Sequence, residues 1–132
     1  MSRSFDLRLA ADPSEAKRLR NELHAWLLQH GINGSTGHDI SLAAVEAFTN
    51  AVQHPVDRKT SAIRLHGQIQ ADTVELSIQD DGAWQNRSQS REHGGYGLTL
   101  IRSLMSNVRV ERTPAGTRVF MRRDLSNQRP PV

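Results

Sequence analysis

Apolar and polar residues alternate in five short segments of the chain, which is the pattern of strands that bury one face of a sheet. Turn residues at 70–73 and 113–116 join two pairs of these segments and predict two hairpins. The strands are marked by Phe5, Leu7 and Leu9, by Ile63, Leu65 and Ile69, by Val74, Leu76 and Ile78, and by residues 108–112 and 117–122.

Three other stretches carry apolar residues at helical spacing. The first begins with Asp12 as the cap and Pro13 in the first helical position, and Glu15 lies where a capping box requires it. Gly31 ends this helix, and we expect residues 31–37 to form a loop. The apolar positions of the helix are Ala16, Leu19, Leu23, Trp26 and Leu27.

A second helix is predicted over residues 39–54, where Pro55 stops it, and a third over about 98–107. One face of the second helix consists mostly of small residues, so this helix can lie close to a sheet. That face is formed by Ile40, Ala43, Ala44, Ala47 and Ala51.

The order β-α-α-β-β-α-β-β predicts a two-layer α/β sandwich, with a mixed, mainly antiparallel five-stranded sheet and three helices on one face. We expect a single domain over residues 1–123. The polar, proline-rich residues 124–132 predict a disordered tail.

Composition narrows the class of protein. The 132 residues include no cysteine, which excludes disulfide scaffolds, cysteine-rich zinc modules and thiol catalysis. No apolar run approaches the roughly 18 residues of a membrane helix, and the first four residues are polar. We therefore expect a soluble cytoplasmic protein without a membrane partner. The net charge of +3 is small and the arginines are scattered along the chain, so we expect a solvated surface and no nucleic-acid partner.

Glu46, Asn50 and His54 have the spacing i, i+4, i+8 on the second helix. They form one stripe with a rise of about 6 Å per step, opposite the small-residue face. An amide oxygen is a hard ligand for Mg²⁺, and a neighbouring carboxylate can accept a proton. By itself the stripe also fits an ordinary solvated helix face.

Three further groups have the composition of a ligand site. Asp80 follows a strand, where its carboxylate can accept a hydrogen bond from an exocyclic amine, and Gly82 lets a flat ring approach the backbone. Gly95 and Gly97 precede a helix, whose N-terminus favours phosphate. Thr117 begins the last strand after a glycine. Taken singly, each group also fits a plain turn or loop.

The order and spacing of these groups resemble the N, G1 and G2 boxes of the GHKL ATPases, over about residues 5–122. The alanine-rich segment before His54 and the run GLTLIRSLMSNVRVE resemble, more narrowly, the anti-sigma factor serine kinases of the RsbW and SpoIIAB type. The resemblance implies the Bergerat, or histidine kinase-like ATPase, fold.

The resemblance also implies a role for each matching residue of the helix stripe. Glu46 would be the general base that polarises the attacking hydroxyl, and Asn50 would ligate the Mg²⁺ that bridges the phosphates. His54 would lie near the phosphates.

For the glycine-containing motifs, the resemblance implies an ATP site. Asp80 would bind the adenine amino group, with Gly82 beneath the ring and Thr117 beside it. Gly95 and Gly97 would line the phosphate end.

The implied function is an anti-sigma factor and serine-protein kinase that binds Mg·ATP and phosphorylates a STAS-type anti-anti-sigma protein. In the alternate state it would sequester a sigma factor, and it would form a homodimer. The first helix contacts partner proteins in the resembled family, which makes Arg20 a candidate for that contact.

Two features depart from the family pattern. Trp84 stands where many members have a second glycine, and the expected lid at residues 85–94 is short. They favour an alternative function, an ATP-binding or nucleotide-independent partner-switch module without significant kinase activity. A histidine-kinase catalytic domain is a third interpretation, disfavoured because the chain lacks room for a dimerisation helix pair with a phospho-acceptor histidine.

Overall fold

The computed structural model describes residues 2–52, 58–82, 98–113 and 116–125. Two helices follow the first strand, and a third helix lies between the two hairpins of the sheet. In chain order the elements are β1 (Ser4–Ala10), a short 3-10 helix η1 (Pro13–Glu15), α1 (Ala16–Gln29), α2 (Gly34–Val52), β2 (Arg58–Gln70), β3 (Thr73–Gly82), a helix at 98–104, β4 (Asn107–Thr113) and β5 (Gly116–Asp124).

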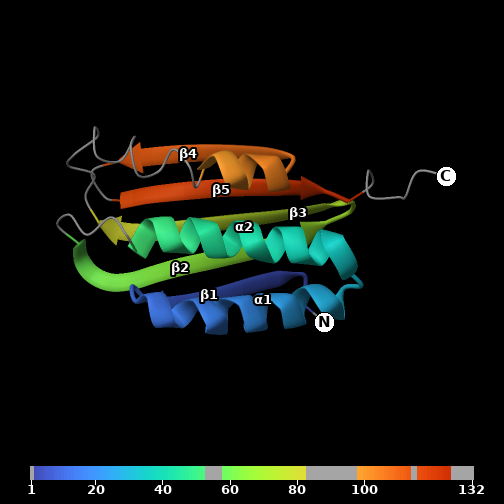
Figure 1. Cartoon of the computed structure of the whole chain (residues 1–132), viewed down its shortest axis with the longest axis horizontal. Coiled ribbons are helices and arrows are strands. Elements are labelled where there is room, and N and C mark those ends of the chain that lie inside the picture. Colours follow the sequence, from blue (N-terminus) through green and yellow to red (C-terminus); the bar gives the residue numbers. More distant parts are fainter. Residues whose placement is uncertain (1, 53–57, 83–97, 114–115, 126–132) are drawn as a thin grey trace.

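The five strands form one sheet in the order β1-β2-β3-β5-β4, and the helices lie together on one face of it (Figure 1). All four pairings between these strands are antiparallel. The predicted two-layer sandwich and both predicted hairpins are confirmed. Every described pairing is antiparallel, where we expected a mixed, mainly antiparallel sheet.

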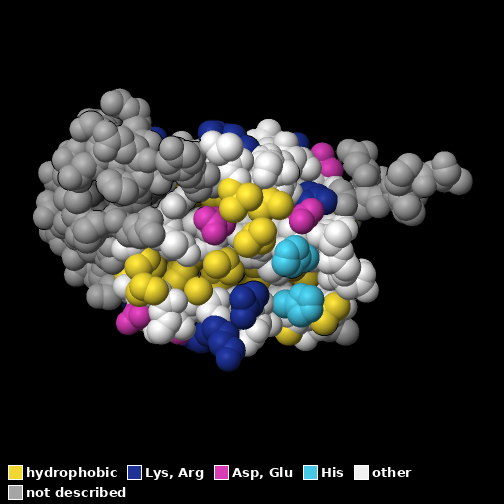
Figure 2. All heavy atoms as spheres, in the orientation of Figure 1, with side chains coloured by type: hydrophobic (Ala, Val, Ile, Leu, Met, Phe, Trp, Pro, Cys, Tyr) yellow, Lys and Arg dark blue, Asp and Glu magenta, His cyan; other side chains and the backbone are white. Residues whose placement is uncertain are grey.

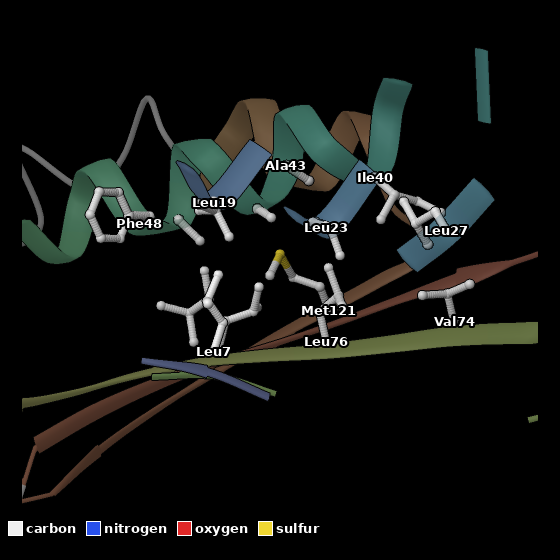
Figure 3. Packing of buried hydrophobic residues seen from close by; sticks show 14 of the residues in the cluster. Leu7, Leu19, Leu23, Leu27, Ile40, Ala43, Phe48, Val74, Leu76 and Met121 are labelled. Atoms are coloured by element: carbon white, nitrogen blue, oxygen red, sulfur yellow. The ribbon is translucent and has the colours of Figure 1, made fainter. Parts of the chain in front are cut away.

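The core fills the space between the sheet and the helices, as Figure 3 shows. Alternation along β3 turns Val74, Leu76 and Ile78 toward the helices, and all three are buried. The small-residue face of α2 is buried as predicted, together with Phe48, which the sequence pattern did not assign to it. Small side chains on this face allow α2 to contact β3.

The start of the first helical segment is capped as predicted, but its capping box is not formed. The Asp12 carboxylate accepts a hydrogen bond from the Ser14 amide at 2.9 Å, and this bond to the backbone lowers the pKa of Asp12. Glu15 accepts from the Ala10 amide at 3.1 Å instead of from Asp12. The reason is that the Asp12 amide already donates to the Ala10 carbonyl at 2.8 Å.

The prediction of a loop at residues 31–37 was wrong in its second half, because α2 begins at Gly34 rather than at Asp39. Gly34 has φ +62°, a conformation that glycine adopts readily. Gly37 is buried within the helix, and a Cβ atom there would lie 3.1 Å from the Ile32 carbonyl oxygen. The helix thus runs through glycines that disfavour helices by propensity, and the missing Cβ at Gly37 leaves room for the Ile32 carbonyl.

The third helix ends at residue 104, earlier than the predicted 107, and Asn107 begins β4. Two bonds to β5 determine this boundary. The Arg123 guanidinium donates to the Leu104 carbonyl at 2.6 Å, and the Ser106 amide donates to the Arg122 carbonyl at 2.7 Å. These contacts terminate the helix and start the pairing of the last hairpin.

The predicted end of the second helix, the lid and residues 126–132 of the predicted tail lie outside the described residues. The tail prediction was wrong at its start, because Asp124 is the last residue of β5 and the Leu125 amide donates to the Asp72 carbonyl at 2.6 Å. Within the described part of the chain, no helix has the length and apolar character needed to cross a membrane.

Candidate functional site

Two polar residues, Asp80 and Thr117, lie at one end of the apolar core. Asp80 follows Ile78 on the helix-facing side of β3 and is 6% exposed. On one side it pairs in register with Ile63 of β2. On the other side the register of β3 and β5 continues to Thr117, which is 8% exposed and whose amide donates to the Asp80 carboxylate at 3.4 Å. The row Ile63–Asp80–Thr117 thus crosses three strands.

The Thr117 hydroxyl is the feature of this row that points to a ligand. Its oxygen is buried and has no hydrogen-bond partner among the described residues. A buried hydroxyl left in this state costs about 1–3 kcal/mol. A ligand edge that carries a donor beside an acceptor could pair its acceptor with this hydroxyl and offer its donor to the neighbouring Asp80 carboxylate. Adenine has such an edge, with an amino donor next to a ring-nitrogen acceptor.

Asp80 and Gly82 belong to the strand itself, whereas the sequence pattern placed Asp80 after the end of a strand. β3 continues through Gly82, which pairs with Arg58 of β2. A shift in register separates this pair from the one formed by Ile63 and Asp80. The irregular pairing lies next to the site, where bulges commonly alter the direction of a strand.

Glu46 and Asn50 lie one turn apart on α2, and both are half-buried. Neither belongs to the buried face of the helix that packs on the sheet, in agreement with the predicted stripe. Their oxygen atoms are of the kind that Mg²⁺ accepts. Within the described ranges, no group of three His, Asp or Glu side chains could hold a metal ion.

His54, Gly95 and Gly97 fall outside the described residues, so the structure does not test their placement. Arg20 is exposed on α1, and its role in a partner contact stays a prediction. Basic side chains gather over α1 in Figure 2, whereas apolar side chains are visible over α2.

Ile63 is part of the site but was predicted only as a core residue. It is completely buried beside Asp80. Alternation along β2 signals that it is buried, but only the register of β2 against β3 shows that it borders the carboxylate.

The open antiparallel sheet with helices on one face has the histidine kinase-like ATPase fold. Residues 9–123 match the family described as Histidine kinase-like ATPase domain, and the chain belongs to this family.

Curated relatives cover much of the chain. Serine-protein kinase RsbW of Bacillus subtilis is 26% identical over an alignment of 141 residues, gaps included, that covers 95% of this chain and 88% of that protein. An anti-sigma F factor of Clostridium acetobutylicum is 28% identical over an alignment of 97 residues, gaps included, that covers 64% of this chain and 68% of that protein.

Solved structures agree on the fold. The RsbU and RsbW domains of Rv1364c from Mycobacterium tuberculosis superpose with a TM-score of 0.74 at 24% identity, covering 92% of this chain and 32% of that chain. This chain therefore spans about a third of that solved chain. The histidine kinase domain of Erythrobacter litoralis EL346 gives a TM-score of 0.60 at 19% identity, covering 91% of this chain and 63% of that one.

Proposed function

We propose that this chain is a cytoplasmic ATP-dependent protein serine kinase that acts as an anti-sigma factor. The observation that carries the proposal is the buried pair of Asp80 and Thr117, with its unpartnered hydroxyl at the end of the core. The relatives named serine-protein kinase RsbW and anti-sigma F factor support the choice of kinase over other members of the family.

In this proposal the base of ATP lies against the row across β2, β3 and β5. The Asp80 carboxylate accepts a hydrogen bond from the adenine amino group, and the Thr117 hydroxyl pairs with a ring nitrogen. Gly82 leaves room beneath the ring, because it has no side chain to oppose a flat ligand. Gly95 and Gly97 line the phosphate end.

We assign phosphoryl transfer to the polar stripe that begins on α2. Asn50 holds Mg²⁺ through its amide oxygen, and His54 lies near the phosphates. Bound Mg²⁺ neutralises negative charge on the phosphates. Glu46 accepts the proton of the attacking serine hydroxyl as the serine oxygen bonds to the γ-phosphorus, and ADP leaves with the electrons of the broken bond.

We infer the partner proteins from the resemblance to the anti-sigma factor kinases. The phosphorylated protein is a STAS-type anti-anti-sigma factor, and the protein held inactive is a sigma factor. We assign Arg20, on the exposed side of α1, to a partner contact, and we propose that the chain acts as a homodimer.

A phosphotransfer assay tests the assignment of the base. Labelled γ-phosphate is followed from ATP to a purified STAS-domain protein, with the wild type, Glu46→Gln and the matched control Glu22→Gln. Glu22 is exposed on α1 and pairs with Arg18, far from the proposed chemistry in sequence. We expect Glu46→Gln to lose about 100-fold or more of the transfer rate while it still binds ATP.

Two results would count against this proposal. Unchanged transfer by Glu46→Gln would remove Glu46 from the role of base. ATP binding without transfer by the wild type would favour the alternative, a nucleotide-binding partner-switch module without significant kinase activity.

A further inference from the structure

Among the described elements, one face of the sheet carries no helices (Figure 1). Alternation along the strands places a row of arginines on this face, because the residues next to them in the sequence are buried or partly buried toward the helices. In the strand register, Arg8 of β1 lies opposite Arg64 of β2, Arg64 opposite Gln79 of β3, and Gln79 opposite Arg118 of β5. Neighbouring strands are about 4.8 Å apart, so the row spans about 14 Å. Three guanidinium groups are thereby brought into one line from distant parts of the sequence.

The charge of this row is not balanced within the described residues. Arg8 and Arg64 face each other directly on adjacent strands, an arrangement of like charges that destabilises a sheet. None of the ion pairs found in the described part of the chain includes Arg8, Arg64 or Arg118. The nearest carboxylate in the neighbouring row, Asp6, contacts His66 at 2.7 Å.

The geometry of the row is partly fixed before any ligand binds. The Arg118 guanidinium donates two hydrogen bonds to the Gln79 side-chain oxygen, at 2.8 and 3.1 Å. Neither bond neutralises the charge, because the acceptor is an uncharged amide. Arg8, Arg64 and Arg118 line an open depression of about 550 Å³ together with Asp6, His66 and Gln79.

A half-buried aromatic ring lies beside the row. Phe120 is two residues after Arg118 on β5, and the Arg109 guanidinium lies 4.3 Å from its ring centroid. The Arg118 guanidinium lies 5.4 Å from the same centroid. Arginine and aromatic side chains are the residue types enriched in protein–protein interfaces and among their energetic hot spots.

We propose that this open sheet face binds an acidic segment of a protein partner, with carboxylates on the row of Arg8, Arg64 and Arg118 and an apolar side chain against Phe120. The span of about 14 Å corresponds to about ten residues of a helix or four of an extended segment. A short acidic segment is therefore long enough to satisfy all three arginines.

Carboxylates on the same face favour a protein partner over a nucleic acid. Glu111 pairs with Arg109 at 3.8 Å and lies opposite Arg118 in the register, and Glu75 lies opposite Arg122. These acidic groups around the row would repel a continuous phosphate backbone. A second copy is also disfavoured, since Glu111 already pairs with Arg109, Asp6 already contacts His66, and two arginine rows would face each other.

The probe is a fluorescein-labelled peptide in which glutamate and leucine alternate, and its binding is followed by anisotropy at low ionic strength. The variant Arg8→Glu/Arg64→Glu reverses two charges of the row, and Lys17→Glu makes a single charge reversal on the exposed side of α1. We expect the double variant to lose about tenfold or more of the affinity, and Lys17→Glu to keep it. The double variant should instead bind a peptide in which lysine and leucine alternate.

Four results would overturn the inference. They are absence of peptide binding at about 1 mM, equal binding by the double variant, preference of the wild type for duplex DNA or polyphosphate over the acidic peptide, and a change in oligomeric state of the double variant in sedimentation. ATP titration of the same variants separates this surface from the proposed nucleotide site. If the wild type does not bind ATP, that result counts against the proposed function, whereas the peptide result still tests the arginine surface.

Discussion

The substitution Asp80→Asn should separate ligand binding from stability at the candidate site. It keeps the shape of the side chain and one acceptor oxygen, but removes the negative charge. Asp80 is 6% exposed, and the hydrogen bond that it accepts from the Thr117 amide is long, at 3.4 Å. An amide oxygen can still accept a hydrogen bond in the same place, and a buried amide is less costly to desolvate than a carboxylate. We expect the free energy of unfolding to change by less than about 1 kcal/mol.

The effect on ATP binding should be larger. A hydrogen bond to a charged acceptor contributes about 1.5–3 kcal/mol, against about 0.5–1.5 kcal/mol for a neutral one. A difference of about 1.4 kcal/mol is tenfold in affinity. We therefore expect Asp80→Asn to weaken ATP binding at least about tenfold.

The assay combines calorimetric titration with ATP and denaturant unfolding of the same preparations. Thr117→Val is the companion variant, because it replaces the unpartnered hydroxyl by a methyl group of nearly the same size. We expect Thr117→Val to raise the free energy of unfolding by about 1 kcal/mol and to weaken ATP binding. Full ATP affinity in both variants, or a large loss of stability in both, would refute the interpretation of this pair as a ligand site.

Three structural predictions can be tested by denaturant unfolding. Gly67→Ala should lower the free energy of unfolding by about 1–3 kcal/mol, because its Cβ would lie 3.1 Å from the Trp26 ring; an unchanged value would contradict that packing. Arg123→Gln should lower it by about 1–3 kcal/mol, because it breaks the 3.1 Å pair with Asp39 on α2; a double-mutant cycle with Asp39→Asn that shows no coupling would exclude this cause. The pKa of Asp12 is lowered from 3.8, so its charge stabilises the fold above that pH and the gain is lost as the pH falls through the lower, folded-state value. Asp12→Asn should therefore be less stable than the wild type at pH 7 and equally stable once the pH is below both values, and a difference that persists in acid would refute a charge effect.

Most of the sheet could be predicted because alternation is a local signal. Val74, Leu76 and Ile78 mark one face of β3, and continuing the same alternation places Asp80 on that buried face. The start of α2 could not be predicted in this way. Gly34 and its neighbours have low helix propensity, yet they are helical in the structure, where Gly37 lies close to the Ile32 carbonyl.

The sequence pattern could not predict contacts between segments that lie far apart in the chain. The arginines of the open face were interpreted as scattered and solvated, since Arg8, Arg64 and Arg118 are far apart in the sequence. The strand register aligns them, and it depends on pairings that a single sequence does not reveal. In the same way, the bond from Arg123 to the end of the helix at 98–104 joins two elements that no local pattern connects.

The central claim is that the row of Ile63, Asp80 and Thr117 accepts the base of ATP, and nucleotide selectivity tests it most directly. The wild type is titrated calorimetrically with ATP and with GTP, each with and without Mg²⁺. Adenine presents an amino donor where guanine presents a carbonyl acceptor, which the Asp80 carboxylate would repel. The account predicts Mg²⁺-dependent binding of ATP and little or no binding of GTP. Equal affinity for the two nucleotides, or binding of neither, would contradict it.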